Sequence, residues 1–342
     1  MEDFLESLSP SLQELAAKAH INDAHQAILT PQAHLLLKDF TEEDVHALKT
    51  AAAKLLAKPT VTGLGNAYKE FLKWVQFFLY ITASELSNLP YSKRYSRVSF
   101  ACTALDKCTR GGILTRGITE FCGAASAGKT QLLLHLCLTV QLNDEVGGLS
   151  GGVAFICTEN RFPSKRLFEM SKYFIRKFPA YEINYMANVH VEHLFESDAL
   201  LKCVGERLPA LMSSTCIKLI IIDSVAAVFR TYVDYVERSS DMRRLANHLL
   251  QLAYKYNSAV ICVNQVATVN EDYPDVPCLG LSWAHLGRTR IRISKIPKQI
   301  RLEGSLLTVR KLEVMYSPDT PNDFAEFLIT KDGIVDVPPT LK

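Results

Sequence analysis

From residue 95 onward, short apolar runs alternate with stretches in which apolar residues recur at helical spacing. The middle runs are apolar at every position, as in residues 219–222 and 259–263. A strand of this kind is buried on both faces, which is typical of a parallel sheet covered by helices. The pattern therefore predicts an α/β domain with mostly parallel strands at residues 117–122, 153–159, 188–194, 218–224 and 258–266.

Three more apolar runs lie near the C-terminus, and we expect them to form antiparallel strands at residues 288–294, 310–316 and 325–335. In the first of these runs, Arg288, Arg290 and Arg292 occupy every second position. A period of two places the three arginines on one face of a strand. That basic face indicates either a contact with phosphate or a partner, or an edge strand whose arginines are solvated.

The first 58 residues show helical spacing, and we expect them to form a small all-α N-terminal domain. Thr41, followed by two glutamates, is predicted to begin one of its helices. Residues 59–94 are interpreted as a linker that contains an oligomerisation segment and an extra helix over 71–89. Residues 95–342 form the main domain in this division.

Composition narrows the class of protein. The 342 residues carry 38 basic and 36 acidic side chains, so any nucleic-acid surface must be local. The nine cysteines form no C-x-x-C pair and several lie in apolar runs, which favours buried thiols in a reducing compartment over disulfides or a zinc site. The N-terminus has no apolar secretory segment, and the run 71–83 is too short to span a membrane, so we expect a soluble intracellular protein without a membrane partner.

A phosphate-binding loop is indicated by the pattern Gly123-x4-Gly128-Lys129-Thr130 between a predicted strand and a leucine-rich helix. Small residues let backbone N–H groups turn inward around an anion, and the helix directs its positive end to the same point. Lys129 would contact the outer phosphates, and the Thr130 hydroxyl would bind Mg²⁺. The alternative is a turn of small residues without a ligand. The predicted nucleotide-binding residues of this loop are Gly123, Ala124, Ala125, Ser126, Ala127, Gly128, Lys129, Thr130 and Gln131.

Polar side chains end three of the predicted strands, where ligand sites of open α/β sheets lie. Asp223 is expected to be a second Mg²⁺ ligand, with a cap of the next turn as the alternative. Glu159 is expected to polarise the attacking water, unless it is only a surface glutamate. Gln265 has a donor and an acceptor with which to sense a γ-phosphate, although a glutamine after a strand is usually a loop residue.

Several segments together resemble the RecA-like recombinases, and most closely the paralogues of their eukaryotic strand-exchange branch. The resemblance covers nearly the whole chain and includes the N-terminal helices, which look like that family's small DNA-binding domain. It is carried by residues 111–142, 151–167, 219–230, 259–269, 279–285 and 317–334. It implies a RecA-like P-loop ATPase core that binds ATP and Mg²⁺ where two subunits meet.

The resemblance also assigns roles to individual residues. Lys129, Glu159 and Gln265 match catalytic positions of the family. Thr130 and Asp223 match the positions that hold the metal ion. Arg166 matches the arginine that stacks on adenine. His285 matches a residue that reaches a neighbour's γ-phosphate, and Pro321 lies in the ATP-capping segment. Leu64 and Ala67 are similar to the aromatic-x-x-alanine segment that family members insert into the next subunit's sheet edge, with leucine in place of the aromatic residue; the alternative is a plain flexible linker.

Three departures from the family pattern change the expected function. The loop after Gln265 carries Glu271, Asp272 and Asp275, and carboxylates repel DNA phosphates. The segment 37–44 has no glycine turn, and residues 316–318 stand where the family has an aspartate that caps ATP. We therefore expect no autonomous strand exchange, and a place at the end of an assembly. The better candidates for DNA contact lie in the first loop, and they are Arg230, Arg238, Arg243 and Arg244.

The sequence thus predicts an ATP-binding recombinase paralogue that acts in homologous-recombination repair of DNA double-strand breaks. We expect it to work in a hetero-oligomer with another paralogue, to bind single-stranded or branched DNA, and to support the main recombinase filament. Its ATPase would be weak and DNA-dependent. One alternative is a scaffold in which ATP only stabilises the partner interface, and another is a small-molecule kinase with the same loop. The expected compartment is the nucleus, with the cytoplasm as a further location.

Overall fold

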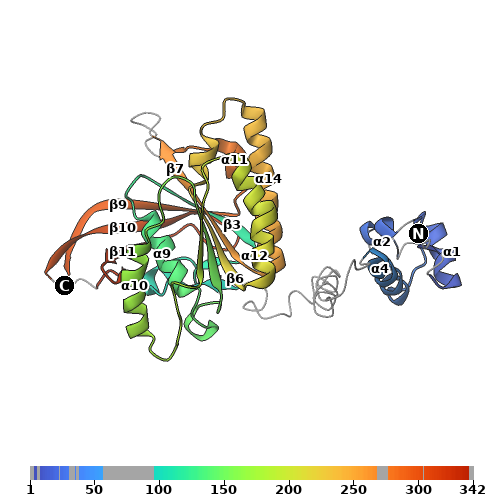
Figure 1. Cartoon of the computed structure of the whole chain (residues 1–342), viewed down its shortest axis with the longest axis horizontal. Helices are drawn as coiled ribbons and strands as arrows, with labels where there is room; N and C mark the ends of the chain where they lie inside the picture. The colour runs from blue at the N-terminus through green and yellow to red at the C-terminus, as the bar shows by residue number, and fades with distance from the viewer. Residues whose placement is uncertain are drawn as a thin grey trace. The chain divides into compact units, whose positions relative to one another are not determined.

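The structure is a computed structural model, and it describes residues 4–5, 8–22, 24–30, 35, 38–56, 96–267, 276–302 and 304–338. The chain divides into two compact units, Met1–Asn88 and Leu89–Lys342 (Figure 1). The predicted domain boundaries after residues 58 and 94, the apolar run 71–83 and the partner segment with Leu64 and Ala67 lie outside the described residues, as do Glu271, Asp272 and Asp275. Those assignments stay predictions.

The smaller unit contains the helices α1 (Pro10–Lys18), α2 (Ala24–Leu29) and α4 (Glu42–Leu56). The predicted helix start at Thr41 is confirmed, because its hydroxyl accepts a hydrogen bond from the Asp44 N–H at 3.1 Å. Asp44 in turn accepts from the Thr41 N–H and hydroxyl, so each side chain caps the other's backbone. The helices enclose a small apolar core that includes Ala16, Leu35, Leu48 and Ala52.

The larger unit is built on a sheet with the strand order β12-β11-β10-β9-β3-β7-β6-β4-β5, and β8 pairs with β7 beside it. The strands from β9 through β3 to β5 are parallel neighbours, and those from β9 to β12 are antiparallel. A separate ribbon pairs β1 (Arg97–Val98) with β2 (Ile113–Leu114). The main strands are β3 (Gly117–Gly123), β4 (Gly152–Cys157), β5 (Val189–His193), β6 (Ile217–Asp223), β7 (Ala259–Ala267), β8 (Val276–Pro277), β9 (Thr289–Leu302), β10 (Ser305–Tyr316), β11 (Phe324–Thr330) and β12 (Gly333–Asp336).

The parallel strands bury both of their faces, as their continuous apolar runs predict. In β6, Leu219 and Ile221 join one core with the helices α9 and α10, while Ile220 and Ile222 join a second core with α11 to α14. The two groups of helices lie on opposite sides of the sheet (Figure 1). The helices of this unit are α8 (Thr103–Cys108), α9 (Lys129–Thr139), α10 (Ser164–Lys177), α11 (Ser197–Lys202), α12 (Leu208–Ser214), α13 (Val225–Phe229), α14 (Tyr235–Tyr256) and α15 (Gly280–Ala284), with the short helical segments Asp144–Val146 and Cys203–Arg207.

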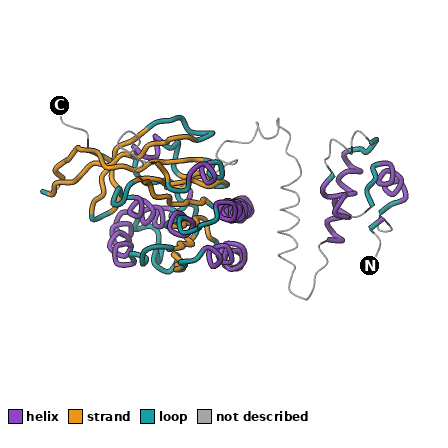
Figure 2. Tube along the Cα trace, turned by 90° about the horizontal axis from the view of Figure 1, so that it is seen from above, coloured by secondary structure: helices purple, strands orange, loops and turns teal. Residues whose placement is uncertain are grey.

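The C-terminal strands differ from the prediction in length and number. The run 325–335 is two strands, β11 and β12, because the chain turns at Lys331 and Asp332. The strands β9 and β10 are longer than predicted and form a hairpin, and Figure 2 shows strands extending past the helices there. The apolar period is weak in the outer half of β9, where side chains are partly or fully exposed, so the sequence understated its length.

For Arg290 the prediction of an accessible basic face is wrong, and the alternative of an edge strand is wrong as well. Strand β9 is not an edge strand, since it lies between β10 and β3. The Nε of Arg290 donates to Glu120 Oε2 at 2.7 Å, and the Glu120 side chain is fully buried. Asn264 donates to the other oxygen of Glu120 at 2.7 Å. Arg290 therefore neutralises a carboxylate inside the sheet and does not present its charge to phosphate or solvent.

A buried histidine joins the helix after the phosphate loop to the last strand. His135 Nε2 donates to the Phe100 carbonyl at 2.8 Å, and the Ile334 N–H donates to its Nδ1. Burial lowers the pKa of His135 to about 3, so the ring is neutral and serves as donor and acceptor at once.

In the described part of the chain, no helix combines the length and the apolar character that crossing a bilayer requires.

Candidate nucleotide-binding site

The phosphate loop joins the end of β3 to the start of α9, as predicted. Its backbone has positive φ at Gly123 (151°), Ser126 (58°) and Gly128 (115°). A Cβ at Gly123 would lie 2.1 Å from the Ile293 carbonyl oxygen, and one at Gly128 would lie 2.8 Å from the Ile329 side chain. Both positions therefore require glycine for reasons of space and backbone conformation. The first turn of α9 leaves backbone N–H groups without helical partners, and these point into the loop.

The lysine and threonine of the loop lie where a nucleotide and its metal would be held. Lys129 Nζ donates to the carbonyls of Gly123 at 2.6 Å and Ala124 at 2.9 Å. Desolvation lowers the Lys129 pKa, although the charge of Asp223 opposes this. The Thr130 hydroxyl donates to Asp223 Oδ2 at 3.0 Å, and burial raises the pKa of that carboxyl. The glycine-lined turn, the ammonium group and the paired oxygens of Thr130 and Asp223 fit a nucleotide phosphate with Mg²⁺.

Sheet register brings the other predicted strand-end residues to the same edge. Gly123 of β3 lies opposite Gln265 of β7, and Cys157 of β4 lies opposite Asp223 of β6. Gln265 Nε2 donates to Glu159 Oε2 at 2.5 Å. Glu159 and Gln265 are thus direct neighbours, a relation that their separation of 106 residues conceals in the sequence.

Arg230, which the sequence did not assign to this site, contacts both Glu159 and Gln265. Arg230 NH1 donates to Gln265 Oε1 at 3.1 Å, and its NH2 lies 3.6 Å from Glu159 Oε1. Arg230 follows α13, whose start comes directly after Asp223 and Ser224. The sequence predicted Arg230 only as a DNA contact, and no local pattern indicates that its side chain reaches the strand-end residues.

Arg166 of α10 connects the loop helix to the end of β11. Its guanidinium donates to Gln131 Oε1 at 2.8 Å and to the carbonyls of Thr330 and Lys331 at 2.6 and 2.7 Å. Desolvation lowers the pKa of Arg166. The structure therefore places Arg166 beside Gln131, at the end of the loop, and its contact with the adenine stays a prediction.

His285 and Pro321 lie on exposed parts of the larger unit, His285 after α15 and Pro321 between β10 and β11. Within the described residues, neither side chain has a hydrogen bond to the phosphate loop of its own chain. Their predicted contacts are with a neighbouring subunit's nucleotide, and those contacts stay predictions.

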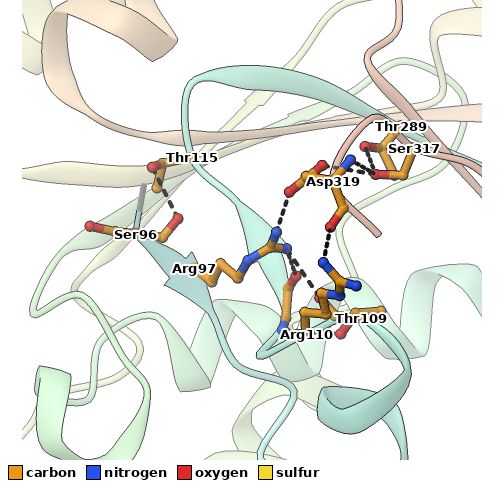
Figure 3. A network of polar contacts seen from close by, with 9 residues as sticks. Ser96, Arg97, Thr109, Arg110, Thr115, Thr289, Ser317 and Asp319 are labelled. Carbon is orange, nitrogen blue, oxygen red and sulfur yellow. Dashed lines mark hydrogen bonds and ion pairs between the residues drawn. The ribbon is translucent and has the colours of Figure 1, made fainter. Parts of the chain in front are cut away.

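Residues 316–318, which stand where the family has a capping aspartate, and the adjoining Asp319 are held to the domain by polar contacts (Figure 3). Asp319 pairs with Arg97 of β1, and its carbonyl accepts from Arg110 at 3.0 Å. Ser317 contacts Asp319 Oδ1 at 2.9 Å. The Tyr316 hydroxyl donates to the Ala284 carbonyl at 2.7 Å, next to His285. The aspartate and tyrosine of this segment thus stabilise the C-terminal part of the domain, and sequence reasoning did not find the Arg97–Asp319 pair.

The other candidate DNA contacts lie on α14. The guanidinium of Arg238 lies over the Tyr235 ring, with its carbon 5.1 Å from the ring centroid. Arg243 donates to the Ser239 carbonyl of its own helix, and Arg244 donates to Asp241 at 3.0 Å. Tyr235 is exposed at the start of α14, and Arg243 and Arg244 are exposed eight and nine residues further along it; their contact with DNA stays a prediction.

The chain is similar to one protein family and to several known proteins. The Rad51 family model matches residues 92–337. DNA repair protein XRCC3 of Bos taurus is 35% identical over 269 residues, which cover 73% of this chain and 78% of that protein. The XRCC3 homolog of Arabidopsis thaliana is 32% identical over 287 residues, 70% of this chain and 92% of the relative. DNA repair protein rhp57 of Schizosaccharomyces pombe is 27% identical over 287 residues, 67% of this chain and 76% of the relative.

Proposed function

The chain belongs to the Rad51 family, and from this premise we propose that it is an ATP-binding paralogue in homologous-recombination repair of DNA double-strand breaks. The fold is that of an ATPase, which implies nucleotide binding, and the XRCC3 and rhp57 relatives are DNA repair proteins. We propose further that it works in a hetero-oligomer with other Rad51-family proteins, in the nucleus.

One observation carries the nucleotide proposal: Lys129, Thr130 and Asp223 converge on a loop whose two glycines have positive φ and pack closely against the chain's own residues. Thr130 and Asp223 would hold Mg²⁺, which neutralises phosphate charge when it is bound. Lys129 would contact the outer phosphates, and Arg166 would face the adenine. The amides of the loop would orient the phosphates.

We propose that Glu159 accepts a proton from the attacking water. The Glu159→Gln substitution should then lower the rate of ATP hydrolysis about 100-fold, the lower end of general-base contributions, because the amide cannot take that proton. ATP affinity should stay within about threefold, since the phosphate loop is unchanged. Phosphate release and titration with a fluorescent ATP analogue measure the two quantities.

The scaffold alternative predicts a different outcome in cells. If ATP only stabilises a partner interface, Glu159→Gln restores repair of double-strand breaks as well as the wild-type chain does, while Lys129→Ala does not. If turnover is required, both variants fail to restore repair. Glu326→Gln is a suitable control, because Glu326 of β11 forms its ion pair with Lys298 of β9 and not with a site residue.

We propose that the partner subunit is bound through Leu64 and Ala67. An alanine that enters a small apolar pocket at a sheet edge cannot be replaced by a carboxylate without desolvating that charge. Ala67→Glu should therefore reduce recovery of the co-expressed paralogue at least about tenfold, a cost of about 1.4 kcal/mol. Asn66→Glu adds the same charge between the two anchor residues and should preserve recovery. Equal recovery with both variants would refute this mode of assembly.

We propose that DNA is bound through Arg230, Arg238, Arg243 and Arg244. Arginines bind phosphate through several N–H groups, and the exposed Tyr235, with Arg238 over its ring, stands beside them as an aromatic surface for a base. Single-stranded or branched DNA is the proposed ligand, and the main recombinase filament is the proposed recipient of the complex.

A further inference from the structure

The side chains of Glu159, Gln265 and Arg230 form a closed ring of polar contacts at the strand ends. Glu159 Oε2 accepts from the Gln265 amide at 2.5 Å, and Glu159 Oε1 lies 3.6 Å from the Arg230 guanidinium. The ring closes because another nitrogen of Arg230 donates to Gln265 Oε1 at 3.1 Å. Both oxygens of the carboxylate are therefore engaged by the chain itself.

Arg230 is the member of this ring that an external ligand can reach. Its side chain is 51% exposed, against 33% for Glu159. It stands between α13, which directly follows Asp223 and Ser224, and the four residues that lead to the exposed start of α14. Arg230 therefore lies beside the sheet edge that carries Asp223, and it is also close in sequence to the other arginines on α14.

We propose that Arg230 is a positioning residue that withholds Glu159 from catalysis until a backbone phosphate of single-stranded DNA draws its guanidinium away. This inference rests on the proposed function and adds the means by which DNA controls it. Arg230 exchanges one anionic partner, the carboxylate, for another, the phosphate. An exposed ion pair at 3.6 Å is weak, so a polyanion can displace it.

The exchange affects the proton-transfer step. Glu159 accepts a proton from water while the water oxygen bonds to the γ-phosphorus and the bridging oxygen leaves with ADP. With the ring closed, a water must compete with Gln265 and Arg230 for the carboxylate oxygens. When Arg230 moves to DNA, one oxygen and the Gln265 carbonyl become available.

The neighbouring arginines do not share this property. Arg238 lies against Tyr235, Arg243 against the Ser239 carbonyl and Arg244 against Asp241, all within α14. Of the four arginines, only Arg230 contacts Glu159 or Gln265 through interactions found in the described part of the chain. The other three arginines would only bind DNA, whereas Arg230 would also couple DNA binding to the release of Glu159.

The test is ATP hydrolysis by the full-length chain at saturating ATP and Mg²⁺, with and without a poly(dT) oligonucleotide. In Arg230→Ala, the DNA-free kcat should rise about tenfold, because Glu159 is released, while the KM for ATP stays the same. Stimulation by poly(dT) should fall to less than twofold. Arg230→Lys retains a cation and should restore both the low DNA-free rate and the stimulation.

Arg207→Ala is the matched control. Arg207 pairs with Glu192 in an ion pair of similar exposure, and the substitution should alter neither the DNA-free rate nor the stimulation. Thermal unfolding of the variants shows whether each is folded. A DNA-free rate in Arg230→Ala equal to or below that of the wild type would overturn the inference, and so would a wild-type rate at saturating ATP that DNA does not change.

A separate titration with a fluorescent ATP analogue distinguishes failure of the proposed nucleotide binding from failure of the inference about Arg230. If the wild-type chain does not bind the analogue, the proposed function itself is refuted and the inference loses its premise. If the chain binds the analogue and Arg230→Ala behaves like the wild type, only the inference is overturned.

Discussion

Replacing Lys129 with alanine should reduce the affinity for ATP at least about 100-fold. The substitution removes a desolvated ammonium group from the phosphate loop, and with it two charge-assisted hydrogen bonds to phosphate of about 1.5 kcal/mol or more each. The carbonyls of Gly123 and Ala124, to which Lys129 donates at 2.6 and 2.9 Å, would then face the phosphates without an intervening cation. Titration of the full-length chain with a fluorescent ATP analogue in Mg²⁺ measures the change.

The matched control is Lys172→Ala, since Lys172 lies over the Phe168 ring on α10. Its affinity for ATP should equal that of the wild type. Lys129→Arg keeps the charge but changes its shape, and it should retain part of the binding. Thermal unfolding must show that Lys129→Ala is folded. An affinity within about threefold of the wild type would contradict the assignment of Lys129 to the outer phosphates.

The second large effect concerns stability. Arg290→Met should lower the free energy of unfolding of the larger unit by about 3–5 kcal/mol, because it leaves a buried carboxylate without its cation. The Glu120 side chain has no exposed surface, and Arg290 is its only cation partner in an ion pair among the described residues. Asn264 donates to the same carboxylate, and this single neutral hydrogen bond does not neutralise the charge. Urea unfolding of the full-length chain measures the change.

The double variant Glu120→Gln, Arg290→Met separates the charge from the packing. It removes both charges and keeps an oxygen for Asn264, so it should recover more than half of the lost stability. Lys298→Met on the same strand breaks the exposed pair with Glu326 and should cost less than about 1 kcal/mol. If the double variant is as unstable as Arg290→Met, the loss comes from packing and not from the unpaired charge.

The sequence predicted the fold well because its signals are local. Continuous apolar runs indicate strands covered on both faces, and Leu219 to Ile222 alternate between the two cores as that interpretation requires. Gly123 and Gly128 adopt backbone conformations and close approaches that glycine alone tolerates. The glycines in the loop pattern therefore predict the conformation of the loop directly. The residues that end β4, β6 and β7 could be placed at one edge because parallel strands share a direction.

The charged side chains were harder to interpret, because the effect of a charge depends on what faces it. Arg290 was predicted on an accessible basic face and is buried against Glu120. Asp319 stands near the position of a capping aspartate but pairs with Arg97, more than two hundred residues away (Figure 3). No periodicity or spacing within either segment encodes its partner.

By itself the sequence determined the parallel strands, the phosphate loop and the placement of Glu159, Asp223 and Gln265 at its edge, since backbone conformation and apolar burial are decided by neighbours along the chain. Only the tertiary structure decided which charges meet: Arg230 with Glu159, Arg290 with Glu120 and Arg97 with Asp319. The physical reason is that the energy of an ion depends on its distance from other charges and from water, and folding alone sets both.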